Sequence, residues 1–316
     1  MIDELRTYNI KFHRSPIRNN KLGIILFPIW FLGIYLKFRP QIIHTHTEVP
    51  DLAIYLFHIV QKFTLQKIKY IRTIHNIKLW TDWGKIGSVV EKFFMRHHAN
   101  IAISRAVQES YKTHYNESPT IVFNGIEMTS QRKFEGLVED KINILFAGRL
   151  EYQKGVDELV AVVSHFANDP MLVFHIVGNG SQKFKVEQLS NFSNVFYYDT
   201  IYNLSQYLFS FDYVFMPSNF EGLATLSIES SFGKTPVIIN SCGGLEETLP
   251  ADWPLKVKNN SVQSYISIFN NLPSQDIYRK LADIGYEYAY KNFTIKKMQQ
   301  NYEYIYTQKI QEITVL

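Results

Sequence analysis

Two cations and two acids occur at spacings suited to binding a phosphorylated sugar. Arg149 and Lys154 lie five residues apart directly after Gly148, where a helix is expected to begin. A glycine turn, a guanidinium, an ammonium and the free N–H groups of a helix start can together bind a diphosphate. Glu221 and Glu229 lie eight residues apart, and carboxylates accept hydrogen bonds from the vicinal hydroxyls of sugars and ribose. Taken alone, each pair would equally suit a solvated loop.

A glycine turn follows the apolar run that ends at Val177. Gly178 and Gly180 permit a ligand to approach the backbone closely. The third glycine of a dinucleotide fingerprint is absent, because Lys183 occupies its place. We therefore expect this turn to line a nucleotide pocket without binding NAD.

Histidines cluster in the first half of the chain. His44, His46 and Glu48 would share one face of a strand, so their side chains could together bind a metal ion. A less favoured alternative is that they form the site of a metal-dependent hydrolase. Pro50 ends that strand and no later His/Asp set completes the site, so we predict no metal. His75 follows the next strand and is expected to line a cleft, or else to be a buried core histidine.

Several classes are excluded by what the sequence lacks. Cys242 is the only cysteine, so no disulfide or cysteine zinc site can form within the chain. P-loop, HExxH, G-x-S-x-G and D-x-D motifs are absent. Without D-x-D, phosphate charge would be neutralised by Arg149, Lys154 and a helix dipole rather than by a divalent cation, and we expect no cofactor.

Composition and charge describe a globular chain with two unlike halves. The 316 residues are 46% hydrophobic and 20% charged, a composition that fills a core and suggests two domains. Residues 1–138 hold 19 Lys and Arg against 10 Asp and Glu, whereas residues 139–316 hold 14 against 19. A basic half suits nucleic acid, anionic lipid or a phosphorylated substrate, or is simply a soluble surface.

Short β-branched runs alternate with amphipathic stretches, which predicts an α/β fold of two successive doubly wound, Rossmann-like parallel-sheet lobes followed by a helical tail over 261–311. The expected strands are 41–46, 69–74, 100–103, 120–123, 142–147, 171–177, 194–197, 213–216 and 236–239, and the expected helices are 51–63, 86–97, 105–115, 156–167, 182–190, 204–209 and 225–232. The predicted domains are 1–126, a linker at 127–140, then 141–260 and C-terminal helices over 261–316 that pack across the lobes.

The most apolar run is Leu22 to Leu36, interrupted by Pro28 and Gly33. Fifteen residues are too few to span a bilayer, which needs about 20. We therefore expect a packed helix, with an interfacial membrane segment as the alternative. The N-terminus shows no secretion signal, which predicts a cytoplasmic protein, peripheral at most at the inner face of the membrane.

Three segments in the second half resemble a known family. FAGRLEYQKGVDELV, HIVGNGS and NFEGLATLSIESSFGKTPVIINSCGGLEE resemble, in order and spacing, the G-R-L-x-x-x-K-G segment, the glycine turn and the E-x7-E motif of the retaining glycosyltransferases of family 4. IIHTHT, TIHN, IAIS and FNGIE are weaker similarities in the first half, so the resemblance covers residues 40–250. It implies the GT-B fold.

The resemblance also implies residue roles. Arg149 and Lys154 would bind the donor diphosphate and stabilise its departure, Glu221 would contact the donor sugar, and Glu229 the ribose. His75 would lie near the transferred sugar. The remaining residues are donor-binding positions and one cleft residue near the lobe junction: Gly148, Gly178, Gly180, Gly222, Leu223, Ala224 and Thr225, with Asn124 at the junction.

The implied activity is transfer of a hexosyl or N-acetylhexosaminyl group from a nucleotide diphosphate sugar to a glycan or polyprenyl-linked acceptor. The setting would be assembly of a cell-surface polysaccharide such as capsule or lipopolysaccharide, with membrane contact through the basic first lobe. No nucleic-acid partner is expected, because that reading leaves the second-lobe motifs unexplained.

The family's first strand and glycine-rich loop are not recognisable here. Ile10-Lys11-Phe12 resembles the second strand region instead, so the first lobe is expected to lack its first βα unit. A catalytically impaired sugar-nucleotide-binding relative is therefore the main alternative.

Overall fold

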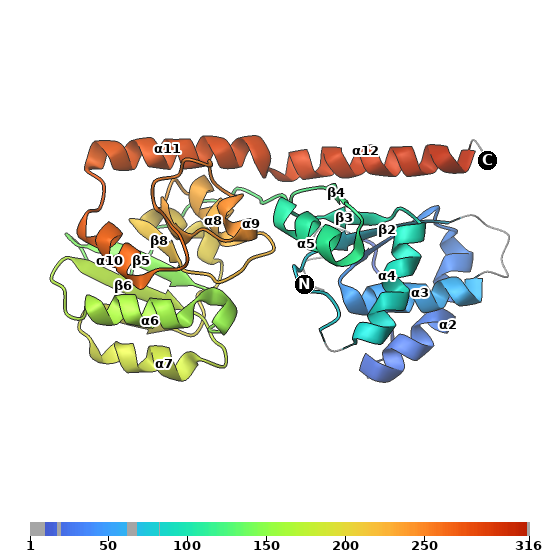
Figure 1. Cartoon of the computed structure of the whole chain (residues 1–316), viewed down its shortest axis with the longest axis horizontal. Helices are drawn as coiled ribbons and strands as arrows, with labels where there is room; N and C mark the ends of the chain where they lie inside the picture. Colours follow the sequence, from blue (N-terminus) through green and yellow to red (C-terminus); the bar gives the residue numbers. More distant parts are fainter. Residues whose placement is uncertain (1–9, 18–19, 62–67, 82, 315–316) are drawn as a thin grey trace. The chain divides into compact units, whose positions relative to one another are not determined.

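The structure is a computed structural model that describes residues 10–17, 20–61, 68–81 and 83–314. The chain divides into two compact units (Figure 1). The first consists of Met1–Ile74, Lys78–Ile101 and Ile305–Leu316, and the second of His75–Ile77 and Ala102–Tyr304. Both are built on parallel sheets, as predicted.

A six-stranded sheet forms the centre of the second unit. Its strand order is β10-β9-β8-β5-β6-β7, and each pair of neighbouring strands is parallel. The strands are β5 (Ile142–Ala147), β6 (Leu172–Val177), β7 (Val195–Tyr198), β8 (Tyr213–Met216), β9 (Val237–Asn240) and β10 (Lys256–Val257). The first five confirm predicted strands. The sequence analysis missed β10, because two residues are too few to show a period.

Helices cover both faces of this sheet. Figure 1 shows α6 (Val156–His165) and α7 (Lys183–Glu187) on one side, with α8 (Thr225–Phe232) and α11 (Gln275–Asn292) on the other. Their apolar sides bury a core that includes Trp253, whose Nε1 donates to the Val237 carbonyl at 2.9 Å. The remaining helices of the tail, α10 (Val262–Asn270) and α12 (Ile295–Thr314), confirm its predicted helical character.

The prediction of a helix over 204–209 is wrong. The segment forms two 3₁₀ turns, Leu204–Gln206 and Leu208–Ser210. Asn203 before them has a left-handed backbone with φ 55°. The chain between Asn203 and β8 thus makes two separate 3₁₀ turns, a form that short connecting segments often take in place of an α-helix.

A smaller sheet has the order β1-β2-β3-β4. Its strands are β1 (Ile42–His46), β2 (Lys69–Ile74), β3 (Asn100–Ala102) and β4 (Thr120–Ile121), and the helices between them are α3 (Glu48–Gln61), α4 (Gly84–Arg96) and α5 (Arg105–Tyr115). All of these elements were predicted within a few residues.

The apolar run Leu22 to Leu36 lies in a helix, α2 (Asn20–Phe38), as expected. Phe31 and Tyr35 of α2 pack edge-on against Phe57 of α3, which ties the two helices into one core. Within the described ranges, α2 and the other helices are too short or too polar to cross a bilayer.

The predicted strand at Ile10–Phe12 is wrong, because these residues have neither helix nor strand structure. Ile10 and Phe12 are 50% and 36% exposed. A strand persists only where its backbone pairs with a neighbour, and a three-residue alternation with half-exposed apolar side chains provides no buried face that would hold it on a sheet.

Candidate functional site

The carboxyl ends of β5 and β8 bring two of the predicted segments together. These strands are neighbours in the sheet, and ligands of doubly wound sheets lie beyond the carboxyl ends of strands. After β5 the chain makes a 3₁₀ turn over Tyr152–Lys154 and passes through Gly155, whose φ of 69° is left-handed. The turn folds the Lys154 side chain back over Gly148, where a Cβ would lie 3.4 Å from its Cδ and Cε.

Lys154 forms an ion pair with Glu221. Its Nζ lies 2.6 Å from Glu221 Oε1, and the same oxygen accepts from the Ser218 hydroxyl at 2.8 Å. Glu221 is 5% exposed whereas the Lys154 side chain is 20% exposed, so Lys154 is the more exposed member of the pair. The buried carboxylate therefore positions a partly exposed cation next to Gly148.

Arg149 is connected by hydrogen bonds, through Gln153, to the loop that carries Glu221. Its Nη2 donates to Gln153 Oε1 at 2.8 Å, and Gln153 Nε2 donates to the Phe220 carbonyl at 3.2 Å. Arg149 is otherwise exposed. Two cations thus lie on one turn, and both are connected to the loop that carries Glu221.

The predicted glycines allow backbone segments to approach one another. A Cβ on Gly178, which has φ 152°, would lie 1.8 Å from the Gly148 carbonyl oxygen, and one on Gly180 would lie 2.5 Å from that of Leu150. A Cβ on Gly222 would lie 2.3 Å from the His75 carbonyl oxygen. The structure therefore brings His75 next to the Glu221 loop, and side chains at these glycines would push the site apart.

Helix α8 begins at Thr225 without a side-chain cap. Its N-cap is Ala224 and its first turn holds no acid. Leu223 and Ala224 are buried, which fixes the loop that leads into this helix start. Uncapped N–H groups at a helix start are a favourable position for an anion.

Glu229 lies on α8, one turn beyond Thr225, whereas Glu221 lies in the preceding loop, as the sequence predicted. Burial raises the pKa of the Glu229 carboxyl above its ordinary value. A half-buried carboxylate with a raised pKa gains from hydroxyl donors, which stabilise its charged form.

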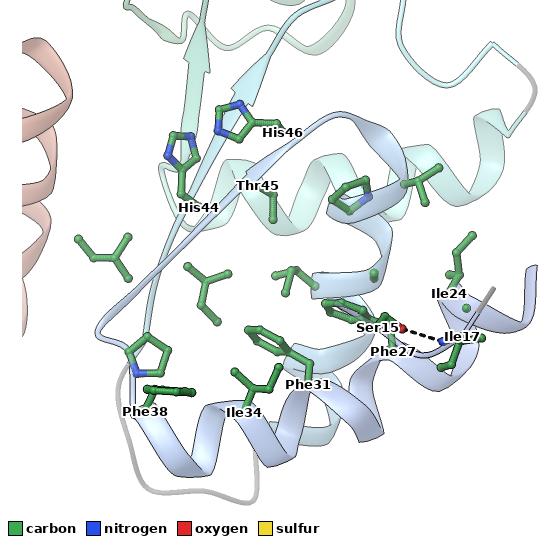
Figure 2. A pocket seen from close by; sticks show the side chains of 18 residues that line it. Ser15, Ile17, Ile24, Phe27, Phe31, Ile34, Phe38, His44, Thr45 and His46 are labelled. Carbon is green, nitrogen blue, oxygen red and sulfur yellow. Dashed lines mark hydrogen bonds between the residues drawn. The ribbon is translucent and has the colours of Figure 1, made fainter. Parts of the chain in front are cut away.

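Two further predicted features, Asn124 and the histidines of β1, have contacts of their own. Asn124 follows Phe123, which packs on Phe293, and precedes Gly125, whose N–H donates to Met298 Sδ at 3.1 Å. His44 belongs to the first unit (Figure 2), where its ring nitrogens contact the Tyr306 hydroxyl at 2.7 Å and Thr73 Oγ1 at 2.8 Å. In the described part of the chain, no three His, Cys, Asp or Glu side chains are arranged to hold a metal ion.

Sequence reasoning missed Ser218, Gln153 and Gly244. A Cβ on Gly244 would lie 2.0 Å from the Gly222 carbonyl oxygen, so the close approach of these two loops requires glycine there. Ser218 precedes Glu221 by three residues, a spacing typical of a capping box, and that spacing was the available signal. Gln153 carried no signal of its own.

The geometry agrees with the family comparison. Residues 127–290 match the family described as glycosyl transferases group 1, and residues 3–130 match glycosyltransferase family 4. The first match alone covers more than half of the chain, so the chain belongs to the group 1 glycosyltransferase family, with a GT-B fold.

Similar sequences include proteins of bacteria and of an archaeon. The chain is 27% identical over 238 residues to an uncharacterised 41.2 kDa protein in the cps region of Klebsiella pneumoniae, covering 68% of this chain and 63% of that protein. It is 25% identical to an uncharacterised glycosyltransferase, MJ1607, of Methanocaldococcus jannaschii, covering 69% and 62%. The chain thus spans less than two thirds of the length of these two relatives. A putative teichuronic acid biosynthesis glycosyltransferase, TuaC of Bacillus subtilis, is 26% identical, covering 82% and 68%.

Solved structures share the fold. Sucrose-phosphate synthase from Thermosynechococcus elongatus aligns with a TM-score of 0.76 and 19% identity over 96% of this chain and 83% of that one. HepE of Anabaena, in complex with UDP and glucose, aligns with a TM-score of 0.77 and 16% identity over 96% and 88%.

Proposed function

We propose that this chain transfers a sugar from a nucleotide diphosphate donor to a glycan or lipid-linked acceptor, with retention of the anomeric configuration. The observation that carries the proposal is the Lys154–Glu221 ion pair beside Arg149 and the uncapped start of α8. Two cations and free helix N–H groups match the two negative phosphates of such a donor.

In the proposed reaction the bond between the sugar's anomeric carbon and the diphosphate oxygen breaks, and charge develops on that oxygen. Arg149, Lys154 and the α8 N–H groups stabilise this charge, so no protein nucleophile is needed. The acceptor hydroxyl attacks from the same face, and its proton passes to the departing diphosphate. Glu221 holds Lys154 in place and accepts hydrogen bonds from the donor sugar, while Glu229 accepts them from the ribose.

We further propose that the donor diphosphate is held without a divalent cation, since the charge on Arg149 and Lys154 can replace it. The proposed setting is the synthesis of a cell-surface polysaccharide at the cytoplasmic face of the membrane. The cps-region protein and the teichuronic acid enzyme among the relatives support this setting.

Calorimetric titration of the purified chain with UDP and with GDP tests the donor site. We expect one nucleotide to bind, and we expect Arg149→Ala, Lys154→Ala and Glu229→Ala each to weaken its affinity by about tenfold or more. Arg149 is exposed, so its replacement leaves the fold intact. The matched control is Lys185→Ala, which removes an ion pair with Asp157 on the surface of the same unit and should leave affinity unchanged.

Failure of a folded wild-type chain to bind either nucleotide would contradict the proposal, as would equal affinity of the wild type and Lys154→Ala. Turnover is a separate test. Binding of a nucleotide sugar without release of nucleotide, in the presence of an acceptor that is accepted by a related enzyme, would identify the catalytically impaired relative instead.

A further inference from the structure

The start of helix α5 is capped by a carboxylate from a distant part of the chain. Glu247 Oε2 accepts from the Arg105 N–H at 2.7 Å, and Glu247 Oε1 accepts from the Ala106 N–H at 2.7 Å. The Ser104 hydroxyl accepts from the Val107 N–H at 3.1 Å. The N–H groups at the first three positions of α5 are therefore all bound, two of them by a charged group 142 and 141 residues away in the chain.

The segment that carries Glu247 is anchored in the core of the second unit. Glu247 directly follows the short helix α9 (Gly243–Glu246). Leu245 is buried, and the Thr248 hydroxyl forms a hydrogen bond with the Ser227 hydroxyl of α8 at 2.7 Å. Because the carboxylate projects from a well-packed segment, its two hydrogen bonds hold the start of α5 in a fixed place.

Helix α5 in turn contacts the segment His75–Ile77, which belongs to the same unit. The Ser110 hydroxyl of α5 donates to the Ile77 carbonyl at 2.7 Å. A Cβ on Gly243 would lie 2.9 Å from Ala106 Cβ and 3.8 Å from Ile77 Cδ1. The helix, this segment and the start of α9 therefore pack against one another.

The His75–Ile77 segment also lies against the Glu221 loop. A Cβ on Gly222 would lie 2.3 Å from the His75 carbonyl oxygen. The Gly244 N–H donates to the Glu221 carbonyl at 3.1 Å, which ties the same loop to α9. A continuous series of contacts thus leads from Glu247, through α5 and His75, to the loop of the proposed donor site.

The charge of Glu247 matters for this cap. Burial raises the pKa of the Glu247 carboxyl, whereas the N–H groups of Arg105 and Ala106 and the Arg105 charge lower it. A carboxylate is also attracted by the positive end of the helix dipole. Glutamine would present one acceptor oxygen and no charge, so it could keep only one of the two hydrogen bonds.

We propose that Glu247 is a positioning residue for the sugar transfer, because by capping α5 it holds His75 against the Glu221 loop. The inference rests on the proposed function, since it concerns the site of that transfer. Glu247 acts through His75, which is expected near the transferred sugar. Loss of Glu247 should therefore slow the chemical step and leave nucleotide binding by Arg149 and Lys154 unchanged.

Ser104 provides a matched control at the same end of α5. Ser104→Ala removes one capping hydrogen bond, as Glu247→Gln does, but leaves both Glu247 contacts in place. Ser110→Ala keeps the whole cap and removes the hydrogen bond to Ile77. If the cap served helix stability alone, turnover would follow the melting temperature in all of these variants.

The test measures nucleotide release by the full chain from UDP-glucose, UDP-N-acetylglucosamine and GDP-mannose with water as the acceptor, and continues with the sugar that the wild type uses best. We expect kcat to fall about tenfold or more in Glu247→Ala, and less in Glu247→Gln and Ser110→Ala. Ser104→Ala should retain the kcat of the wild type. The double variant of Glu247→Ala and Ser110→Ala should be no slower than Glu247→Ala, because both changes act through Ile77.

Nucleotide affinity separates failure of this inference from failure of the proposed function. UDP or GDP affinity should be the same in the wild type and in each variant. A wild type that binds neither nucleotide would contradict the proposed function itself. Normal nucleotide binding with equal kcat in the wild type and Glu247→Ala would overturn only the role of Glu247, as would a fall in Ser104→Ala as large as that in Glu247→Gln.

The nuclear magnetic resonance signals of the His75 ring give a readout that needs no donor. Assigned with His75→Gln, these signals should shift in Glu247→Ala and stay in place in Ser104→Ala. Signals that stay in place in Glu247→Ala would overturn the proposal even if kcat fell, because His75 would then not depend on the cap.

Discussion

Ion pairs occur in both units, and water reaches them to very different extents. In the second unit, Lys154 keeps a fifth of its side chain exposed while it contacts Glu221. In the first unit, Arg72 is 1% exposed, its Nε lies 3.2 Å from Asp51 Oδ2, and its Nη1 lies 2.8 Å from Glu91 Oε1. Pairing of a cation with carboxylates therefore leaves Lys154 accessible to solvent in the second unit and encloses Arg72 in a buried network in the first.

The free energy of unfolding should depend more strongly on Arg72, the cation of the enclosed network, than on Lys154. We expect Arg72→Met to lower the free energy of unfolding by about 3 to 5 kcal/mol, because it leaves two buried carboxyl groups without their partner. Urea unfolding monitored by circular dichroism measures this. An effect no larger than that of Lys154→Met would remove the distinction between the two clusters.

Backbone packing gives the next largest contrast. We expect Gly244→Ala to destabilise the second unit by about 2 to 3 kcal/mol, because its Cβ would overlap the Gly222 carbonyl, and to weaken nucleotide binding through the displaced loop. In α2 of the first unit, Gly33→Ala should instead stabilise by up to about 1 kcal/mol, since nothing lies within 4 Å of the new Cβ. Thermal and urea unfolding of both variants test the pair.

The stability contributed by the enclosed network of the first unit should also depend on pH. Burial, opposed by Arg72, raises the pKa of Asp51 to about 7. Because the folded state binds this proton more tightly than the unfolded state, Asp51 contributes stability that is fully present below about pH 4 and is lost as pH rises towards 7, with a slope of about 1.4 kcal/mol per pH unit. The stability of Asp51→Asn should lack this slope when unfolding is measured between pH 4.5 and 7.5, and a slope identical to that of the wild type would exclude Asp51 as its source.

The smallest effect is expected for the connection between Arg149 and the Glu221 loop. Gln153→Ala should weaken nucleotide affinity by about three- to tenfold, because Arg149 loses the partner that positions it. Its melting temperature should remain that of the wild type. Unchanged affinity would show that the ligand alone orients Arg149.

The elements that the sequence predicted best are those whose pattern is local. Mainly apolar runs such as 142–147 and 213–216 are strands with those same bounds, because a strand covered on both faces needs no alternation. Arg149, Lys154, Glu221 and Glu229 could be proposed as site residues from the sequence, since each follows a recognisable strand or lies on a recognisable helix.

What the sequence did not reveal depends on contacts between distant segments. Ser218 and Gln153 act through partners that only the folded chain brings near, and Gly244 matters because Gly222 lies against it.

The placement of the four tryptophans has a practical spectroscopic consequence. Trp30, Trp80 and Trp83 belong to the first unit, whereas Trp253, enclosed in the core beside Val237, belongs to the second. In Trp253→Phe the indole emission arises from the first unit alone, and the difference from the wild type is the signal of the second. Fluorescence can therefore resolve whether the two halves melt as one cooperative transition or as two, without any attached dye.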